Sequence, residues 1–326
     1  MAEWLFEQGI GEDRAILLEE GRIVEAAIEL PGEVRAGSVH TARLTEIHVP
    51  GRRGLAELED GTAVLVEPLP PGVVHGGRLH VEIVREPLPE RGRPKLARGR
   101  ATELPESPAP SLRERIGGAA LHGLTGPDRF EEAGWSELLE EAITGEIAFP
   151  GGALRMNLTP AMTLFDVDGG FAPAALAVTG AEAAACAIRR FGIGGSIGID
   201  LPTVPGKAER QAAAAAVDAV LPQPFERTAV NGFGFLQIVR RRERASLPEL
   251  LQADPVGASA RALLRRAERS VGAGERTLQA HPSVIARLEA QPRWLEELAR
   301  RMGAPVALQA DPALAISAAH VHARHA

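Results

Sequence analysis

Two aspartates, each near the end of a short apolar run, are the residues whose type and spacing best fit a catalytic or metal-binding site. Asp166 lies in the run 162–167 and Asp200 lies in the run 196–201, and each run has a pair of glycines beside it. Short apolar runs bounded by glycine or proline are typical of buried strands. A carboxylate at the end of such a strand is expected at the edge of the core, partly in water.

An alanine-rich segment, 172–191, separates the two runs. From Thr179 onward it has the signals of a helix: Thr179 as the N-cap, an acidic residue three positions later and two arginines in the last turn. The predicted order is therefore strand, loop, helix, strand. A right-handed crossover of this kind can place the two strands side by side.

A metal site is the chemistry that this arrangement predicts. Asp166 and Asp200 would lie close together, and neighbouring carboxylates repel each other unless a cation lies between them. Oxygen ligands favour Mg²⁺, with Mn²⁺ as the other candidate. The structural alternative is that each aspartate caps a turn or a helix after its strand, which is a common role for this residue.

Three segments of the chain form an ordered set. They are 166–168 (Asp-Val-Asp), 194–200 (Gly-Gly-Ser-Ile-Gly-Ile-Asp) and 230–242, which contains Asn-Gly-Phe-Gly-Phe and ends in three arginines. Together they resemble the catalytic core of the ribonuclease E/G family. The family's motifs, in the same order, are Asp-hydrophobic-Asn after a strand, Gly-Gly-x-Ile-Val-Ile-Asp, and a Ser-Arg-Phe-Gly segment that ends in Ser-Arg-Gln-Arg. The resemblance covers most of the chain and is weaker towards both ends.

The resemblance implies a metal-dependent endoribonuclease that hydrolyses single-stranded RNA. Asp166 and Asp200 would hold Mg²⁺ (or Mn²⁺), and together with Asp168 they would form the catalytic group. Asp168 stands where the family has an asparagine. The extra carboxylate could strengthen metal binding, recruit a second metal ion or add repulsion near the scissile phosphate.

Other positions depart from the family's pattern. Asn157 and Pro160 stand on the strand before the first aspartate, where the family commonly has acidic residues, and Gly232 replaces the arginine of the Phe-Gly segment. Losses around a metal centre lower affinity or activity by about 10–100-fold. An RNA-binding member of the family with weak or lost nuclease activity is therefore an alternative. A third hypothesis is an α/β domain that resembles the family but has no role in RNA metabolism.

An α/β (α+β) fold is expected. Residues 1–36 alternate between apolar and polar in three strands, which predicts an antiparallel meander. Regularly spaced glycine turns in 37–100 predict a small OB-type barrel. By resemblance, the parts are an RNase H-like subdomain (1–36, completed by the linker and helices of 101–150), an inserted S1-like OB barrel (37–100), a DNase I-like catalytic subdomain (151–245) and a small C-terminal α/β domain (246–326). The patterns also predict helices at 111–124 and 128–145, and strands at 225–239 and 313–319.

Two basic clusters are candidate contacts for the RNA backbone. One is near the end of the barrel segment, where a lysine stands in the position of the lysine of the family's Gly-Thr-Lys-Gly motif, and the other is expected beside the metal site. The residues are Lys95, Arg93, Arg240, Arg241 and Arg242. In both places the alternative is a solvated charge cluster. The barrel segment itself has no Phe, Trp or Tyr, so the aromatic residues expected on its RNA face are missing.

The composition limits the classes of function. The formal net charge of −7 argues against a protein that binds nucleic acid through bulk positive charge. No apolar run is long enough for a membrane span and no secretory signal is evident, so a cytoplasmic protein without a membrane partner is expected. The single cysteine, Cys186, excludes an intramolecular disulfide. It also excludes the Cys-x-x-Cys that links family dimers through zinc, so a monomer or weak oligomer is expected.

Overall fold

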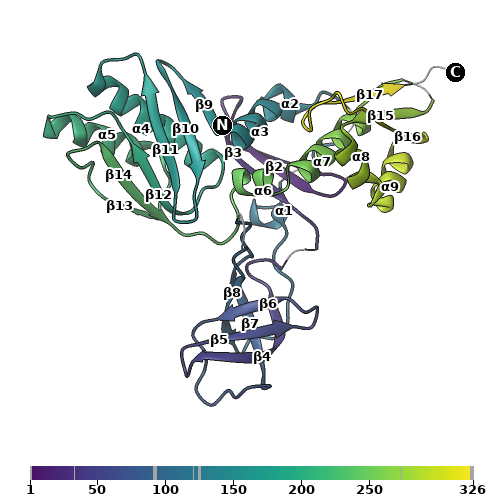
Figure 1. Cartoon of the computed structure of the whole chain (residues 1–326), viewed down its shortest axis with the longest axis horizontal. Helices are drawn as coiled ribbons and strands as arrows, with labels where there is room; N and C mark the ends of the chain where they lie inside the picture. The colour runs from purple at the N-terminus through teal and green to yellow at the C-terminus, as the bar shows by residue number, and fades with distance from the viewer. Residues whose placement is uncertain are drawn as a thin grey trace. The chain divides into compact units, whose positions relative to one another are not determined.

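The structure, a computed structural model, describes residues 2–32, 34–90, 94–119, 121–123, 126–272 and 274–323. It is a mixed α/β chain with several sheets and one closed barrel (Figure 1). The chain divides into two compact units, each described by itself below. The first comprises Met1–Pro31, Ile116–Leu139 and Leu251–Ala326, and the second comprises Gly32–Arg115 and Glu140–Leu250.

The first unit opens with the predicted antiparallel meander. Its strands are β1 (Glu3–Gln8), β2 (Asp13–Glu19) and β3 (Arg22–Glu29), in the order β1-β2-β3. The central strand β2 is the most buried, and Ala15 and Ile16 are fully covered. Burial does not alternate along β2, because all five residues from Arg14 to Leu18 are buried, so the sequence pattern predicted the strands but not how deeply they are covered.

A second sheet of the first unit has the order β16-β15-β17, with β15 (Arg276–Ala280), β16 (Val306–Ala310) and β17 (Ala319–Ala323). Helices α7 (Pro255–Glu268), α8 (Pro282–Glu289) and α9 (Pro292–Met302) pack with it. The predicted strand at 313–319 is wrong. Asp311 starts a turn there, because its carboxylate accepts a hydrogen bond from the Ala313 N–H at 2.9 Å. Pairing with β15 resumes only at Ala319.

A buried ion network ties α7 to the meander. The Glu12 carboxylate is 2.8 Å from Arg261 Nε and also pairs with Arg265. All three side chains are less than a tenth exposed. Because removing one partner leaves buried charge uncompensated, this network makes the fold of the first unit depend on Glu12.

The helices predicted at 111–124 and 128–145 are shorter than expected. The first is only α1 (Leu112–Arg115), and the second is two helices, α2 (Arg129–Glu132) and α3 (Trp135–Thr144). Glycines with positive φ interrupt them: Gly117 (φ 77°) follows α1, and Gly134 (φ 92°) lies between α2 and α3. A left-handed residue cannot continue a right-handed helix, so the apolar periodicity alone overestimated both lengths.

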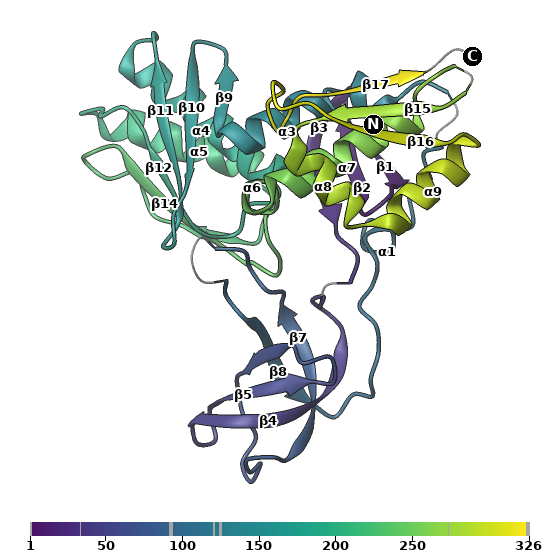
Figure 2. The same cartoon turned by 45° about the vertical axis from the view of Figure 1, so that its right-hand side comes forward.

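In the second unit, five strands form a closed barrel in the order β4-β5-β6-β8-β7 (Figure 2). They are β4 (Val39–Val49), β5 (Arg53–Leu58), β6 (Ala63–Val66), β7 (Arg78–Arg85) and β8 (Ala97–Thr102). All neighbouring pairs are antiparallel except β6 and β8, which are parallel. The barrel interior is filled by small and branched apolar side chains, including Leu44, Val64 and Val81.

The second unit also contains a six-stranded sheet in the order β13-β14-β12-β11-β10-β9. Its strands are β9 (Glu146–Phe149), β10 (Gly152–Leu158), β11 (Thr163–Gly169), β12 (Gly195–Asp200), β13 (Phe225–Arg227) and β14 (Phe235–Arg240). The helices that follow β11, β12 and β14 are α4 (Pro173–Arg190), α5 (Lys207–Val220) and α6 (Leu247–Ala253). Helix α4 packs against α5, β10 and β11.

Helix α4 is the predicted crossover between β11 and β12, but it starts earlier than expected. Pro173 is at its first turn and Ala172 is the N-cap. Thr179 is inside the helix, and its hydroxyl donates to the Ala175 carbonyl at 3.1 Å. Gly180 lets the helix approach the sheet, because a Cβ there would lie only 2.3 Å from Val167 Cγ1.

The single strand predicted at 225–239 is instead the strand pair β13 and β14 with a tight turn before β14. Asn231 closes this turn: its side-chain oxygen accepts from the N–H groups of Phe233 (2.9 Å) and Phe235 (3.1 Å). Gly234 follows with φ 94°. Alternation of apolar residues through 229–235 therefore reflected a turn and not an extended strand.

Candidate active site

The two aspartates are direct neighbours in the six-stranded sheet. Asp166 of β11 is the register partner of Asp200 of β12, and the two strands run parallel. Neighbouring strands lie about 4.8 Å apart, and directly paired residues share one face of the sheet. Both aspartates are exposed. The predicted side-by-side placement of the two strands, with Asp166 next to Asp200, is confirmed.

The strand pleat explains why these carboxylates point away from the core. Phe165 and Val167 flank Asp166 and are buried, and Ile199 beside Asp200 is fully covered. Val167 faces α4, as the close approach of that helix shows. Because side chains alternate between the two faces, Asp166 and Asp200 lie on the face opposite α4.

The same row of the sheet brings two further residues beside the aspartates. Arg155 of β10 is the partner of Asp166, and Phe235 of β14 is the partner of Asp200. Glu146 of β9 pairs in turn with Arg155, with 3.7 Å between Glu146 Oε1 and Arg155 Nε. Neither Arg155 nor Phe235 was identified as a site residue from the sequence. Arg155 is the one charged side chain in the run 152–158, but its position beside Asp166 depends on strand register.

Asp168 lies two residues beyond Asp166 on β11 and pairs with Ala153 of β10. It is on the same face as Asp166, about 7 Å away along the strand. The ligand atoms of Asp166, Asp168 and Asp200 do not all come within 4.8 Å of one another, a condition that only Glu7, His122 and Asp128 meet in the described part of the chain. The three aspartates thus form a pair and a separate third carboxylate.

The turn before β14 is bonded to the end of β12. Leu201 N–H donates to the Gly234 carbonyl at 3.2 Å, and the Thr203 hydroxyl donates to the Phe233 carbonyl at 3.1 Å. Gly234 is required at this contact, because a Cβ there would lie 2.2 Å from the Leu201 carbonyl oxygen. This turn therefore holds Phe233 beside the strand end that carries Asp200.

The arginine run that begins at the last residue of β14 is not beside the aspartates, which corrects the placement expected from the sequence. Arg240 pairs with Gly195, at the start of β12, whereas Asp200 is at the end of that strand. Five residues of strand separate the two levels by about 17 Å. The reason is that β14 is antiparallel to β12, so its last residues run away from the carboxylates.

The three arginines also differ in their contacts. Arg240 Nη1 donates to the Ile193 carbonyl at 3.0 Å, and Arg242 forms an ion pair with Glu249. The Arg241 side chain is 74% exposed and has Glu243 at 3.0 Å. Of the three, Arg241 is therefore the one best placed for a contact with a ligand.

The other predicted RNA contacts are on the barrel. Arg93 lies outside the described residues. Lys95 is described, and its ammonium group pairs with Glu90. The neighbouring Arg98 and Arg100 pair with barrel glutamates at 2.8 Å each. Much of the positive charge of the barrel is thus matched by carboxylates of the barrel itself.

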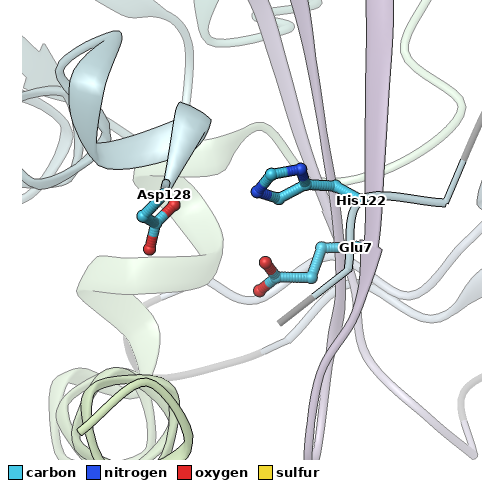
Figure 3. Close-up of side chains that lie close together, drawn as sticks. All are labelled: Glu7, His122 and Asp128. Atoms are coloured by element: carbon cyan, nitrogen blue, oxygen red, sulfur yellow. The ribbon is translucent and has the colours of Figure 1, made fainter. Parts of the chain in front are cut away.

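Glu7, His122 and Asp128 of the first unit point toward one another (Figure 3). Guanidinium groups already hold the carboxylates: Arg14 Nε donates to Glu7 at 2.9 Å, and Arg269 Nε lies 2.8 Å from Asp128. Burial lowers the pKa of His122, with the charge of Arg269 acting in the same direction. Because Arg14 and Arg269 already neutralise the two carboxylates, this cluster is a partly buried polar network and a poor metal centre.

Neither protein-family models nor curated proteins match this chain. In the described part of the chain, every helix is too short or too polar to span a membrane. The function must therefore be inferred from the chain's own residues and their geometry.

Proposed function

We propose that this protein is a metal-dependent endoribonuclease of the ribonuclease E/G type that hydrolyses single-stranded RNA. The observation that carries the proposal is the direct pairing of Asp166 with Asp200 on adjacent parallel strands, with both carboxylates exposed. This donor set of closely spaced carboxylate oxygens fits Mg²⁺, and Mn²⁺ is the other candidate.

Four residues on this face of the sheet have a role in this proposal. Asp166 and Asp200 would hold the cation. Arg155, the partner of Asp166, is a positive charge beside the carboxylate pair and can orient Asp166 or contact a phosphate oxygen. Asp168 is one row away and is available to accept a proton from the attacking water. The chemistry that Mg²⁺ supplies when bound is a water of lowered pKa and neutralisation of phosphate charge.

The architecture supports the finer fold assignment. The barrel order β4-β5-β6-β8-β7, with the parallel pair β6 and β8, fits a five-stranded Greek-key barrel of the OB type. Met1–Pro31 and Ile116–Leu139 group together although the barrel lies between them in sequence, which supports a barrel inserted in an RNase H-like part. We assign 151–245 to a DNase I-like catalytic subdomain on the basis of the sheet that holds the aspartates.

The C-terminal α/β part does not form a compact unit of its own. Leu251–Ala326 belongs to the same unit as the N-terminal meander. Ile10 of the loop after β1 is in one apolar cluster with residues of α7 and α8, including Leu263 and Ile285. We therefore propose that the small α/β part is continuous with the core of the RNase H-like part.

An RNA-binding protein with weak or lost nuclease activity is the second candidate. Two observations favour it: Asp168 replaces an asparagine, and the arginine run lies about 17 Å from the level of Asp200 along the strand. Both weaken the electrostatic environment expected around a scissile phosphate.

Cleavage of a labelled, 5′-monophosphorylated, single-stranded RNA tests the proposal. The assay is run with Mg²⁺, with Mn²⁺ and with EDTA, on the wild-type protein and on Asp166→Asn and Asp200→Asn. Glu226→Gln is the matched control, since Glu226 is an exposed carboxylate on β13 of the same sheet. We expect cleavage that requires a divalent cation and both aspartates. Binding without cleavage would support the second candidate, and cleavage that persists in both aspartate variants would refute the site.

A further inference from the structure

Phe233 is a large apolar side chain that the protein leaves in water. Phe233 is 84% exposed, the highest value of any exposed phenylalanine in the described residues. Phenylalanine is usually buried, because its ring contributes most to stability inside a core. An exposed ring contributes little to the stability of the fold, so we expect a function that requires it on the surface.

The backbone around Phe233 is held by hydrogen bonds on both sides. The Asn231 side chain accepts from the N–H groups of Phe233 and Phe235, and the Thr203 hydroxyl donates to the Phe233 carbonyl. Gly234 continues the turn with positive φ and bonds to Leu201. The ring is thus presented on a fixed turn and not on a long loop.

This turn places Phe233 beside the proposed catalytic pair. Phe235, two residues later, is the register partner of Asp200, and its ring covers Gly198 on the same face of the sheet. Phe171, the other exposed phenylalanine near the strand ends, lies against Gly151 of the β9–β10 turn. Phe171 is only 47% exposed, because its ring packs against this glycine. Phe233 is the ring that remains available.

We propose that Phe233 is the base-stacking platform of the active site. An unpaired base next to the phosphate at Asp166 and Asp200 stacks on its ring. This inference rests on the proposed function and adds a determinant of specificity, because a base held in a duplex cannot present its face to the ring. It also accounts for the barrel segment 37–100 having no aromatic residue, since the stacking surface is supplied by the catalytic sheet.

Equilibrium binding of a labelled single-stranded RNA in EDTA tests the inference without any cleavage. Stacking of one base accounts for about 5- to 150-fold in affinity. We expect Phe233→Ala and Phe233→Leu to weaken binding by a factor in this range, and Phe233→Trp to retain it. Val239→Ala is the matched control: Val239 is an exposed apolar residue of β14, but it pairs with Ser196, away from Asp200.

A tryptophan at this position also gives a direct signal. The chain's own tryptophans, Trp4, Trp135 and Trp294, belong to the first unit. In Phe233→Trp, stacking should quench the new fluorescence on addition of single-stranded RNA, and RNA with an abasic site at the stacked position should not quench it. Duplex RNA of the same sequence should also leave the fluorescence unchanged.

The outcomes separate this inference from the nuclease proposal. If the wild type binds RNA and Phe233→Ala binds equally well, the stacking role is refuted whatever the cleavage assay shows. If Phe233→Ala loses affinity but the wild type does not cleave, the stacking role stands and the nuclease proposal fails. A wild type that binds no single-stranded RNA refutes both. Because the ring is exposed, its substitution should not disturb the fold. The circular dichroism spectrum of each variant should therefore match that of the wild type, which excludes misfolding as the cause of lost binding.

Discussion

Replacing Asp200 with asparagine should change stability in opposite directions with and without a divalent cation. Asp200→Asn keeps the size of the side chain and removes one of two neighbouring charges. With paired strands about 4.8 Å apart, two unit charges at about 5 Å repel by about 0.8 kcal/mol in water and about 3 kcal/mol at an effective dielectric constant of 20. Because both carboxylates are exposed, the lower value applies, and we expect a stabilisation of about 1 kcal/mol in EDTA.

The cation reverses the order of the two proteins. Mg²⁺ at about a hundred times its dissociation constant adds about 2.7 kcal/mol to the free energy of unfolding of a protein that binds it only when folded. The wild type should gain this stabilisation, whereas Asp200→Asn should gain little because one of its two ligands is lost. Wild type should therefore be the less stable protein in EDTA and the more stable one in saturating Mg²⁺.

Urea unfolding followed by circular dichroism measures both effects. The EDTA comparison is made at low ionic strength, because about 0.15 M salt shortens the screening length to about 8 Å and reduces the repulsion. Glu226→Gln, which removes a charge from β13 of the same sheet, should change stability little in either condition. A destabilised Asp200→Asn in EDTA would refute the reasoning, since it would show that the carboxylate caps the strand end.

Three further predictions concern the scaffold. Glu12→Gln leaves two buried arginines without their carboxylate, so we expect a loss of about 3–5 kcal/mol in urea unfolding followed by tryptophan fluorescence; a loss under about 1 kcal/mol would contradict the ion network. Gly234→Ala should lower the urea midpoint, because the added Cβ meets a carbonyl oxygen at 2.2 Å and φ is 94°, whereas Gly232→Ala, which has open space, should not. Hydrogen bonds from Arg300, which has the largest effect, and from Arg301 lower the pKa of Glu297 to about 2. The resulting stabilisation should be complete above the usual pKa of about 4.3 and be lost as the pH falls through about 2; carboxyl titration by NMR with a midpoint near 4 would be the contrary result.

The position of the arginine run has a consequence for any RNA contact. If Arg241 contacts RNA, it does so at the other end of β12 from Asp200, so one bound strand would have to follow the sheet along its strands. Stacking at Phe233 and phosphate contact at Arg241 would then act on different nucleotides. The two contributions to affinity should add, because sites so far apart rarely share partners.

Local patterns were sufficient for the elements that depend on neighbours in sequence. The alternation in 1–36 predicted three strands, and the runs around Asp166 and Asp200 predicted two strands joined by a helical crossover. Those patterns reflect which side chains an element must bury, and burial follows from residue type and periodicity. Lengths were less certain: positive φ at Gly134 divides one predicted helix, and a turn at Asn231 divides one predicted strand.

The sequence by itself determined that two carboxylates would stand at the ends of adjacent strands, because the crossover and the buried runs are local features. Only the tertiary structure decided what surrounds them. Strand order put Arg155 and Phe235 on either side of the pair, and the antiparallel direction of β14 carried its arginines to the far end. The physical reason is that the period-2 pattern of a strand sets which of its faces is buried, whereas backbone hydrogen bonds can form with any partner strand, so the pattern of one segment does not specify its neighbour.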